Sequence, residues 1–510
     1  MRFAVYGIIT LLTSAWAAAV LAAPCGPRTS ESNDEVVYAT DCAIQYAATT
    51  TTGGIQEAID SCGAGSPSKG CIVVLPRGDV HVTSTISIGG LDLPTAKMGV
   101  VLRGHGSGVV NTIQVPRGGT NIIWDDEASG ASVISVQGIG HRLEDFNVWG
   151  DSGDNGVNVV DTLLEIQALG SAMTSGIIVE SVGLFGTRDL GGLGATQPLG
   201  VAVRGKGGNY NDQLDRIVVR NSSVSRVRGC LEQNSKQALL NLWQQVNCSQ
   251  FDEFGVNILA GSFSIVESVF SWNRDTHVGA AIQFNAGSAG GTLYENVERC
   301  HFEMGSGMAI RATSEGGAQG RRAMRIVGNN FVMQYADPSP DDPEFDNDFI
   351  NLQERGSVAI TGNSFEWTTG TPPISGVGGD IVVNSTLPSQ VFAAANFTRN
   401  LVNLDWEVTG AAHLVCHDAD ELGVFDDANC DSQREPGEAY LNGASNSDSQ
   451  GAMRWGMSDG ADWDTGDEVC AEVGLSCTET FDLDNYYWSH RFVACDEGHD
   501  TGHRFLALCK

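Results

Sequence analysis

Short apolar strands recur along the chain from about residue 100 to about residue 400. Each unit holds a strand of alternating apolar and polar residues, a turn rich in Gly, Ser and Asn, and then a second strand. The second strands include residues 216–224, 264–270, 324–331 and 358–365. Units this short cannot bury their own apolar side chains, so neighbouring units must stack into one continuous core.

The spacing of these units favours a parallel β-helix over a propeller. Successive units begin about 25 to 40 residues apart, and the extra residues fall in the turns. Propeller blades need antiparallel hairpins, and the Asn-Gly pairs typical of such hairpins are nearly absent. We therefore predict an all-β solenoid whose strands bury one face. Its coils could stack an amide ladder from Asn329, Asn330, Asn363 and Asn396.

The segment before the repeats resembles a known family. Residues 54–110 contain IQEAIDSC, then VVLPRG, then VVLRGHGSG. This run is similar to the opening of the pectate-lyase-like right-handed β-helix superfamily, and the likeness covers roughly residues 50–400. It implies a right-handed parallel β-helix with an N-terminal capping helix. The superfamily contains lyases, hydrolases, epimerases and depolymerases, mostly of polysaccharides, so the fold leaves the reaction open.

The ends of the chain differ from the repeats. Residues 1–23 have one Arg, an apolar run and small residues, which is typical of a secretory signal peptide. We therefore expect an exported protein, extracellular or periplasmic, without a membrane span. The β-helix with its cap is predicted over 24–405. A Cys-rich C-terminal module is predicted over 410–510, with a role in sugar binding, surface attachment or capping.

Composition narrows the class of protein. The chain has 29 Lys plus Arg and 62 Asp plus Glu, a net charge of −33, which opposes binding of nucleic acid. The 13 cysteines include four near the start and six from Cys416 onward, as two disulfide-stapled regions would. The middle three, Cys230, Cys248 and Cys300, leave at least one thiol unpaired. The oligomeric state is not indicated by the sequence.

Charged residues gather in the turns after the second strands, and equivalent turns stack side by side in a β-helix. We therefore expect one outward-facing strip that forms the active site. Its predicted catalytic residues are Arg274, Asp275, His277 and Glu253. Its predicted substrate-binding residues are Arg188, Arg226, Arg228, Trp272, Glu303 and Arg321, and Asp252 is the predicted metal ligand.

The densest turn, residues 271–279, suits cleavage of a uronic-acid chain by β-elimination. Arg274 could offset the substrate carboxylate, which stabilises an enolate-like intermediate. His277 could remove the proton, because its ordinary pKa lies near neutrality. Asp275 could orient His277 or bind a cation. The alternative is that these residues are solvated and make only local salt bridges.

A glycoside hydrolase would instead need two carboxylates, about 5 Å apart or more. Asp252, Glu253, Asp275 and Glu303 stand on neighbouring units and could supply such a pair. Of the motifs of the polygalacturonase-type family only GHG at 104–106 is present, and we interpret its His105 as structural.

Calcium is the one cofactor that the sequence suggests. The loop 336–348 concentrates carboxylates, which Ca²⁺ prefers, although it could equally be an exposed acidic insertion. Our first hypothesis is a secreted lyase or epimerase acting on an anionic uronate-type polysaccharide. The net charge opposes such a substrate unless cations or the arginines of the strip screen it. A glycoside hydrolase and a non-catalytic carbohydrate-binding or surface adhesion protein are the alternatives.

Overall fold

The computed structural model describes most of the repeat region and parts of both ends. The described residues are 24–29, 35–62, 70–89, 98–107, 119–125, 132–150, 160–168, 173–186, 197–205, 212–235, 237–272, 280–286, 294–304, 308–314, 323–333, 348–367, 381–394, 396–399, 406–420, 423–426, 452–457, 470–471, 476–482, 492–493 and 504–509. The predicted signal peptide, residues 1–23, lies outside this set.

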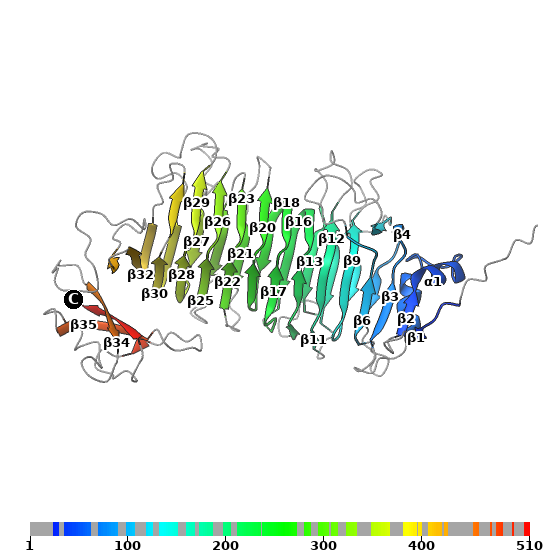
Figure 1. Ribbon diagram of the computed structural model, residues 1–510, viewed down its shortest axis with the longest axis horizontal. Helices are drawn as coiled ribbons and strands as arrows, with labels where there is room; N and C mark the ends of the chain where they lie inside the picture. Colours follow the sequence, from blue (N-terminus) through cyan, green and yellow to red (C-terminus); the bar gives the residue numbers. More distant parts are fainter. Residues whose placement is uncertain are drawn as a thin grey trace, which may run out of the picture.

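The molecule is a right-handed parallel β-helix, as the sequence predicts. Its strands run side by side along an elongated body, with the helices α1 and α2 at the N-terminal end (Figure 1). Every strand-to-strand pairing between successive coils of this body is parallel, from β2–β3 to β30–β32. Each coil contributes one strand segment to each of three sheets.

The first sheet precedes the tightest turn of each coil. It contains β2 Glu35–Tyr38, β3 Cys71–Val74, β6 Val100–Arg103, β9 Arg142–Trp149, β12 Ile178–Phe185, β15 Val218–Arg220, β17 Asn241–Gln244, β19 Phe263–Val266, β22 Tyr294–Glu298, β25 Ala323–Val327 and β28 Ser357–Thr361.

The second sheet follows that turn. Besides the later halves of β9 and β12, it contains β4 Gly78–Val82, β7 Thr120–Trp124, the first half of β16 Ser223–Asn234 and of β18 Asn247–Ile258, β20 Val269–Trp272, β23 His301–Met304, β26 Asn330–Met333, β29 Ser364–Trp367 and β31 Phe397–Arg399.

The third sheet closes the coil. It contains β5 Ile86–Ile88, β8 Ser132–Val136, β10 Thr162–Gln167, β13 Leu199–Arg204, the later halves of β16 and β18, β21 Ala280–Ala286, β24 Met308–Ser314, β27 Ile350–Gln353, and the first parts of β30 Ile381–Ala394 and β32 Trp406–Asp420. A small separate pair joins β11 Thr174–Ser175 to β14 Leu214–Asp215.

The turn between the first and second sheets depends on one left-handed residue per coil. This column has φ near +50 to +66° and contains Asp145, Ser181, Asn221, Gln245, Glu267, Arg299, Gly328 and Gly362. Non-glycine residues pay a conformational cost in this region. Because the same position repeats in every coil, the stacking of the coils compensates for that cost. The turn therefore keeps both sheets in register.

A buried amide ladder follows the left-handed column in the later coils. Asn329 Nδ2 donates to Asn363 Oδ1 at 3.0 Å, and Asn363 Nδ2 donates to Asn396 Oδ1 at 3.0 Å. This confirms the predicted ladder for these three residues. The prediction for Asn330 is wrong, because strand alternation turns it to the outer face, where its Nδ2 lies 3.0 Å from His301 Nδ1.

Stacked aromatic rings fill the core beside this ladder. Phe270, Phe302, Phe331 and Phe365 occupy the same position in four successive coils, with ring centroids 4.8 to 5.2 Å apart. All four side chains are fully buried, and so is Trp243. Burial of this continuous apolar stack is the main force that holds the coils together.

The N-terminal end is closed by helices and disulfides. The helix α2, Ile55–Ser61, is the capping helix that the resemblance implies, and it buries Ile55, Ala58 and Ile59 against the first coil. The helix α1, Ala39–Gln45, packs against α2. Cys25 pairs with Cys42, and Cys62 with Cys71. The short strand β1, Arg28–Thr29, pairs with β2 antiparallel.

The middle cysteines behave as their odd number predicts. Cys230 and Cys248 form a disulfide that joins adjacent coils, and Cys300 is free and buried. Burial raises the pKa of the Cys300 thiol to about 12, so it is an inert core residue.

The C-terminal end contains antiparallel strands. The strand β33, Gly423–Asp426, pairs back on β32. A separate sheet joins β34 Ala452–Met457, β37 Arg504–Cys509, β35 Cys477–Asp482 and β36 Phe492–Val493, and Cys470 nearby in sequence is disulfide-bonded. Parallel pairing of the solenoid continues through β32 to Cys416, past the predicted boundary at residue 405. Within the described residues, no helix is long and apolar enough to span a bilayer.

Candidate functional site

The candidate site lies where the second sheet bends into the third. The strands β16 and β18 run through this corner without a break, and each bends at a left-handed residue, Arg226 with φ 56° and Gln250 with φ 52°. The preceding coil has Gly186 at this position, and a Cβ there would lie 1.7 Å from the Arg226 carbonyl oxygen. Glycine is therefore required for the coils to stack closely at this corner.

Arg226 is more deeply placed than the other predicted substrate-binding residues of this corner. It is 9% exposed, and its Nε donates to Gln250 Oε1 of the next coil at 3.2 Å. Desolvation lowers the pKa of Arg226, but a guanidinium remains a cation at any physiological pH. It therefore places a fixed positive charge at the corner, with little freedom to follow a ligand.

Arg228 and Glu253 form the exposed part of the corner. Arg228 Nε and Glu253 Oε2 lie 3.9 Å apart, and their side chains are 36% and 56% exposed. Asp252 precedes Glu253 in β18 and is half-buried. A loose exposed ion pair of this kind contributes little to stability, so both groups can exchange partners with a ligand.

The next two coils bring Trp272 and Glu303 beside this corner. Ser271 of β20 pairs with Ser249 of β18 on one side and with Glu303 of β23 on the other. Trp272 ends β20, and residues 273–279, which follow it in the sequence, lie outside the described residues. The structure thus places Arg226, Arg228, Asp252 and Glu253 on adjacent coils at the bend, and Glu303 two coils farther along.

The remaining predicted site residues lie outside the described residues. These are Arg188, Arg274, Asp275, His277 and Arg321. Of Trp272 only the backbone is described. The acidic loop 336–347 is also outside the set, and among the described residues no three His, Cys, Asp or Glu side chains cluster as a metal site would require. The roles assigned to these residues and to Asp252 therefore stay predictions.

His301 is a candidate that the charged turns did not reveal. It stands two residues before Glu303 on β23, so both side chains project from the same outer face. Its Nδ1 lies 3.0 Å from Asn330 Nδ2, which therefore donates to it and leaves the proton on Nε2. The signal that could have found His301 is the alternation of the strand itself, in which His301 and Glu303 share one parity.

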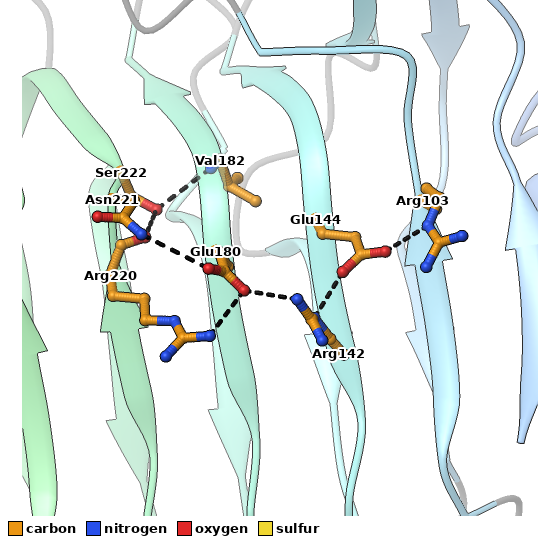
Figure 2. Close-up of polar contacts among 8 residues, drawn as sticks. All are labelled: Arg103, Arg142, Glu144, Glu180, Val182, Arg220, Asn221 and Ser222. Carbon is orange, nitrogen blue, oxygen red and sulfur yellow. Dashed lines mark hydrogen bonds and ion pairs between the residues drawn. The ribbon is translucent and has the colours of Figure 1, made fainter.

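A second charged cluster lies on the first sheet, across the tight turn. Figure 2 shows a chain of ion pairs that runs from Arg103 through Glu144, Arg142 and Glu180 to Arg220. We call these five residues the charge ladder. It crosses four successive strands, β6, β9, β12 and β15.

The glutamates of the charge ladder each form ion pairs with two of its arginines. Arg142 Nη2 lies 2.6 Å from Glu180 Oε2, and Arg220 Nη2 lies 2.9 Å from the same oxygen. The hydrogen bond from Arg220 holds the pKa of Glu180 below its ordinary value. Burial, helped by the neighbouring Glu144, raises the pKa of Asp145. The ion pairs of three arginines with two glutamates join successive coils.

Comparison with known proteins gives distant structural likenesses. No family model matches the chain, and no curated protein matches it in sequence. A DFA-IIIase of Arthrobacter chlorophenolicus A6, in a form without its lid, is 13% identical with a TM-score of 0.49, over 76% of this chain and 95% of that one.

Two further solved structures are similar to a comparable degree. A tailspike protein of the Acinetobacter baumannii bacteriophage Fri1, a capsular polysaccharide depolymerase, is 11% identical with a TM-score of 0.45, over 93% of this chain and 85% of that one. A surface adhesin of Streptococcus pneumoniae is 10% identical with a TM-score of 0.37, over 74% of this chain and 89% of that one. Likenesses at this level transfer no activity to this chain.

Proposed function

We propose that the protein is an exported enzyme that cleaves an anionic uronate-type polysaccharide by β-elimination. The observation that supports this most is the corner itself. Stacking of the coils places Arg228 beside Glu253 at the bend into the third sheet, and it places Glu303 two coils farther along on the second sheet, in register with Ser249. Cations and carboxylates gathered around one bend suit a polymer with a charge on each sugar.

The chemistry needs a cation, a base and a proton source near that bend. In the proposal Arg274 offsets the uronate carboxylate, and His277 takes the proton from the carbon next to it. The electron pair of that carbon–hydrogen bond forms the carbon–carbon double bond as the bond to the glycosidic oxygen breaks, and the leaving oxygen takes a proton from water. Asp275 orients His277, as carboxylates commonly do for a catalytic imidazole. These three residues follow Trp272 of β20 in the sequence and precede β21. Asp252 or the acidic loop 336–348 would hold Ca²⁺ if the reaction uses it.

Export is part of the same proposal. Three disulfides are formed in the described residues, and Cys470 makes a further one. Disulfides persist in oxidising compartments, which favours an extracellular or periplasmic location.

The experiment is to incubate the protein with a panel of uronate polymers and to follow two signals. β-Elimination creates a carbon–carbon double bond that absorbs ultraviolet light, whereas hydrolysis creates reducing ends without it. We expect the double bond to form. Reducing ends alone would identify a hydrolase acting through paired carboxylates, and binding without either product would identify a carbohydrate-binding or adhesion protein. Both outcomes would overturn the proposed reaction.

Variants locate the reaction in the chain. His277→Ala and Asp275→Asn are each expected to abolish the signal while circular dichroism stays unchanged. The matched controls are His81→Ala and Asp125→Asn, because His81 Nδ1 and Asp125 Oδ2 form an exposed pair at 2.6 Å on the early coils. Full activity in the His277 and Asp275 variants would reject this site.

A further inference from the structure

We propose that the outer face of the second sheet is a saccharide-binding track, along which a sugar chain lies parallel to the β-helix axis. The track consists of Phe185, Ser225, Ser249, Ser271 and Glu303. The class of ligand is taken from the proposed function. The track adds the path by which the polymer reaches the bend between the second and third sheets. A chain bound here would pass the bend of Arg228 and Glu253 at the coil of Ser249 and end at Glu303.

Strand register places the five residues in one straight row. Phe185 pairs with Ser225, Ser225 with Ser249, Ser249 with Ser271, and Ser271 with Glu303. Neighbouring strands lie about 4.8 Å apart, so four steps span about 19 Å. Apart from Ser225, which is 9% exposed, the members of the row are half-buried, which is the exposure expected of groups that contact a ligand along one side.

An aromatic pair forms the N-terminal end of the track. Phe185 stacks on Trp149 of the preceding coil, with ring centroids 4.5 Å apart and an interplanar angle of 25°. Trp149 is 3% exposed, whereas Phe185 is half-buried and so presents part of its ring to solvent. A Cβ on Gly183 would lie 2.6 Å from Phe185 Cε2, so the ring lies over Gly183. Glycine at this position therefore allows Phe185 to present a fixed apolar surface, which suits the apolar face of a sugar ring.

Hydroxyl groups form the middle of the track. Ser249 Oγ lies 3.1 Å from Ser225 Oγ, so the serines of adjacent coils bond to each other. Each hydroxyl can donate one hydrogen bond and accept two, which leaves capacity for a hydroxylated ligand. Glu303 ends the row with a carboxylate that only accepts when ionised. This sequence of apolar ring, hydroxyls and carboxylate suits a chain rich in hydroxyl groups.

Unpartnered oxygens on the same face support this assignment. Asn147 is fully buried; its Nδ2 donates to Asn121 Oδ1 at 2.9 Å, and Asn121 in turn donates to Asp79. Asn147 Oδ1 has no hydrogen-bond partner among the described residues, and it lies 2.4 Å from the position a Cβ of Gly183 would take, beside the Phe185 ring. Asn330 Oδ1, farther along this face, is also unpartnered within the described set.

A saccharide fits these oxygens better than a polymer with few hydroxyls does. A buried acceptor without a donor destabilises the folded protein, and such groups often mark a site where a ligand or water completes the bond. Sugar hydroxyls are donors that can complete these bonds once the side chains covering the two oxygens move aside. The track has no Arg or Lys in its row, so it would not hold a nucleic acid, whereas Arg226 and Arg228 stand just beyond its edge for the carboxylates of a uronate.

The test compares binding of a uronate disaccharide and of a long uronate oligomer by calorimetry. Phe185→Ala is expected to weaken binding of the long oligomer about tenfold, since stacking on one ring is lost. The disaccharide should be affected much less if it binds mainly at the corner. Phe185→Leu keeps the packing against Trp149 and should also weaken binding, whereas Phe185→Tyr should preserve it. Ser249→Ala should weaken binding of the long oligomer severalfold.

The controls separate failure of the track from failure of the proposed function. Tyr46→Ala and Ser87→Ala alter an exposed aromatic ring and an exposed hydroxyl elsewhere, and they should leave binding unchanged. If the wild-type protein cleaves the polymer but the Phe185 and Ser249 variants bind the long oligomer as tightly, the track is wrong and the function stands. If the wild type neither binds nor cleaves any uronate polymer, both are wrong.

Discussion

The charge ladder and the saccharide-binding track lie on either side of the same tight turn, and they use the stacking of coils differently. In the charge ladder each carboxylate of one strand meets an arginine of the next, so the charges satisfy one another. In the track, neighbouring coils carry hydroxyls, an aromatic ring and a carboxylate, and the hydroxyls can each form further bonds besides the one between Ser225 and Ser249. Side chains at equivalent positions of successive coils thus stabilise the stacking when they are complementary in charge, and form a binding surface when they are not.

The largest effect is expected on folding stability when the pH is lowered, because of His141 beside the charge ladder. His141 directly precedes Arg142, is fully buried, and accepts a hydrogen bond from the Val100 amide at Nδ1. Desolvation lowers the pKa of His141 from 6.5 to about 4. Below pH 6.5 His141 binds a proton in the unfolded chain but stays neutral in the folded protein until the pH approaches 4. Stability is therefore lost as the pH falls from about 6.5 to about 4.

The measurement is the free energy of unfolding in urea against pH, for the wild type and for His141→Gln. The wild type should lose about 3 kcal/mol more than the variant across this window. Parallel curves would mean that His141 titrates normally in the folded protein.

Breaking the charge ladder should cost stability without affecting binding. Glu144 forms ion pairs with Arg103 and Arg142, and its side chain is 7% exposed. Glu144→Gln removes the charge that pairs them, so we expect the free energy of unfolding to fall by about 2 kcal/mol. The affinity for a long uronate oligomer should not change. Lost affinity in a folded Glu144→Gln protein would extend the binding surface to the first sheet.

The matching change on the track should do the opposite. Glu303→Gln is nearly isosteric and alters a half-buried group on β23. We expect a change in unfolding free energy of no more than about 0.5 kcal/mol, with binding or turnover of the polymer reduced severalfold. If the Glu303→Gln variant is destabilised but fully active, Glu303 stabilises the stacked coils and does not bind the polymer.

The smallest effect is expected at the exposed corner pair. A double-mutant cycle on Arg228→Ala and Glu253→Ala should give a coupling below about 1 kcal/mol in the absence of polymer, because the pair is long and solvated. A larger coupling would mean that the two groups are committed to each other and unavailable to a ligand.

The sequence predicts the architecture well because the repeat forces it. Apolar alternation and turn spacing predict the parallel coils and the amide ladder of Asn329, Asn363 and Asn396, and the family resemblance implies the capping helix α2; all of these are observed. The error at Asn330 shows the limit, since one residue decides whether a side chain faces the core or solvent.

The site could be predicted only in part, for a physical reason. Neighbours in the charge ladder such as Arg103 and Glu144, or Glu180 and Arg220, are about 40 residues apart with turns of unequal length between them. Their pairing depends on register, which variable turns hide. The charged turns do not indicate His301 and Phe185, because each of these residues lies inside a strand.

Hydroxyl-radical footprinting with and without a long uronate oligomer tests the contrast between the two faces most directly. The account predicts that Phe185 and His301, on the second sheet, are protected from oxidation by the oligomer, while exposed Tyr46 and Leu240, away from that face, are oxidised equally in both states. Equal oxidation of Phe185 with and without a bound oligomer would contradict it.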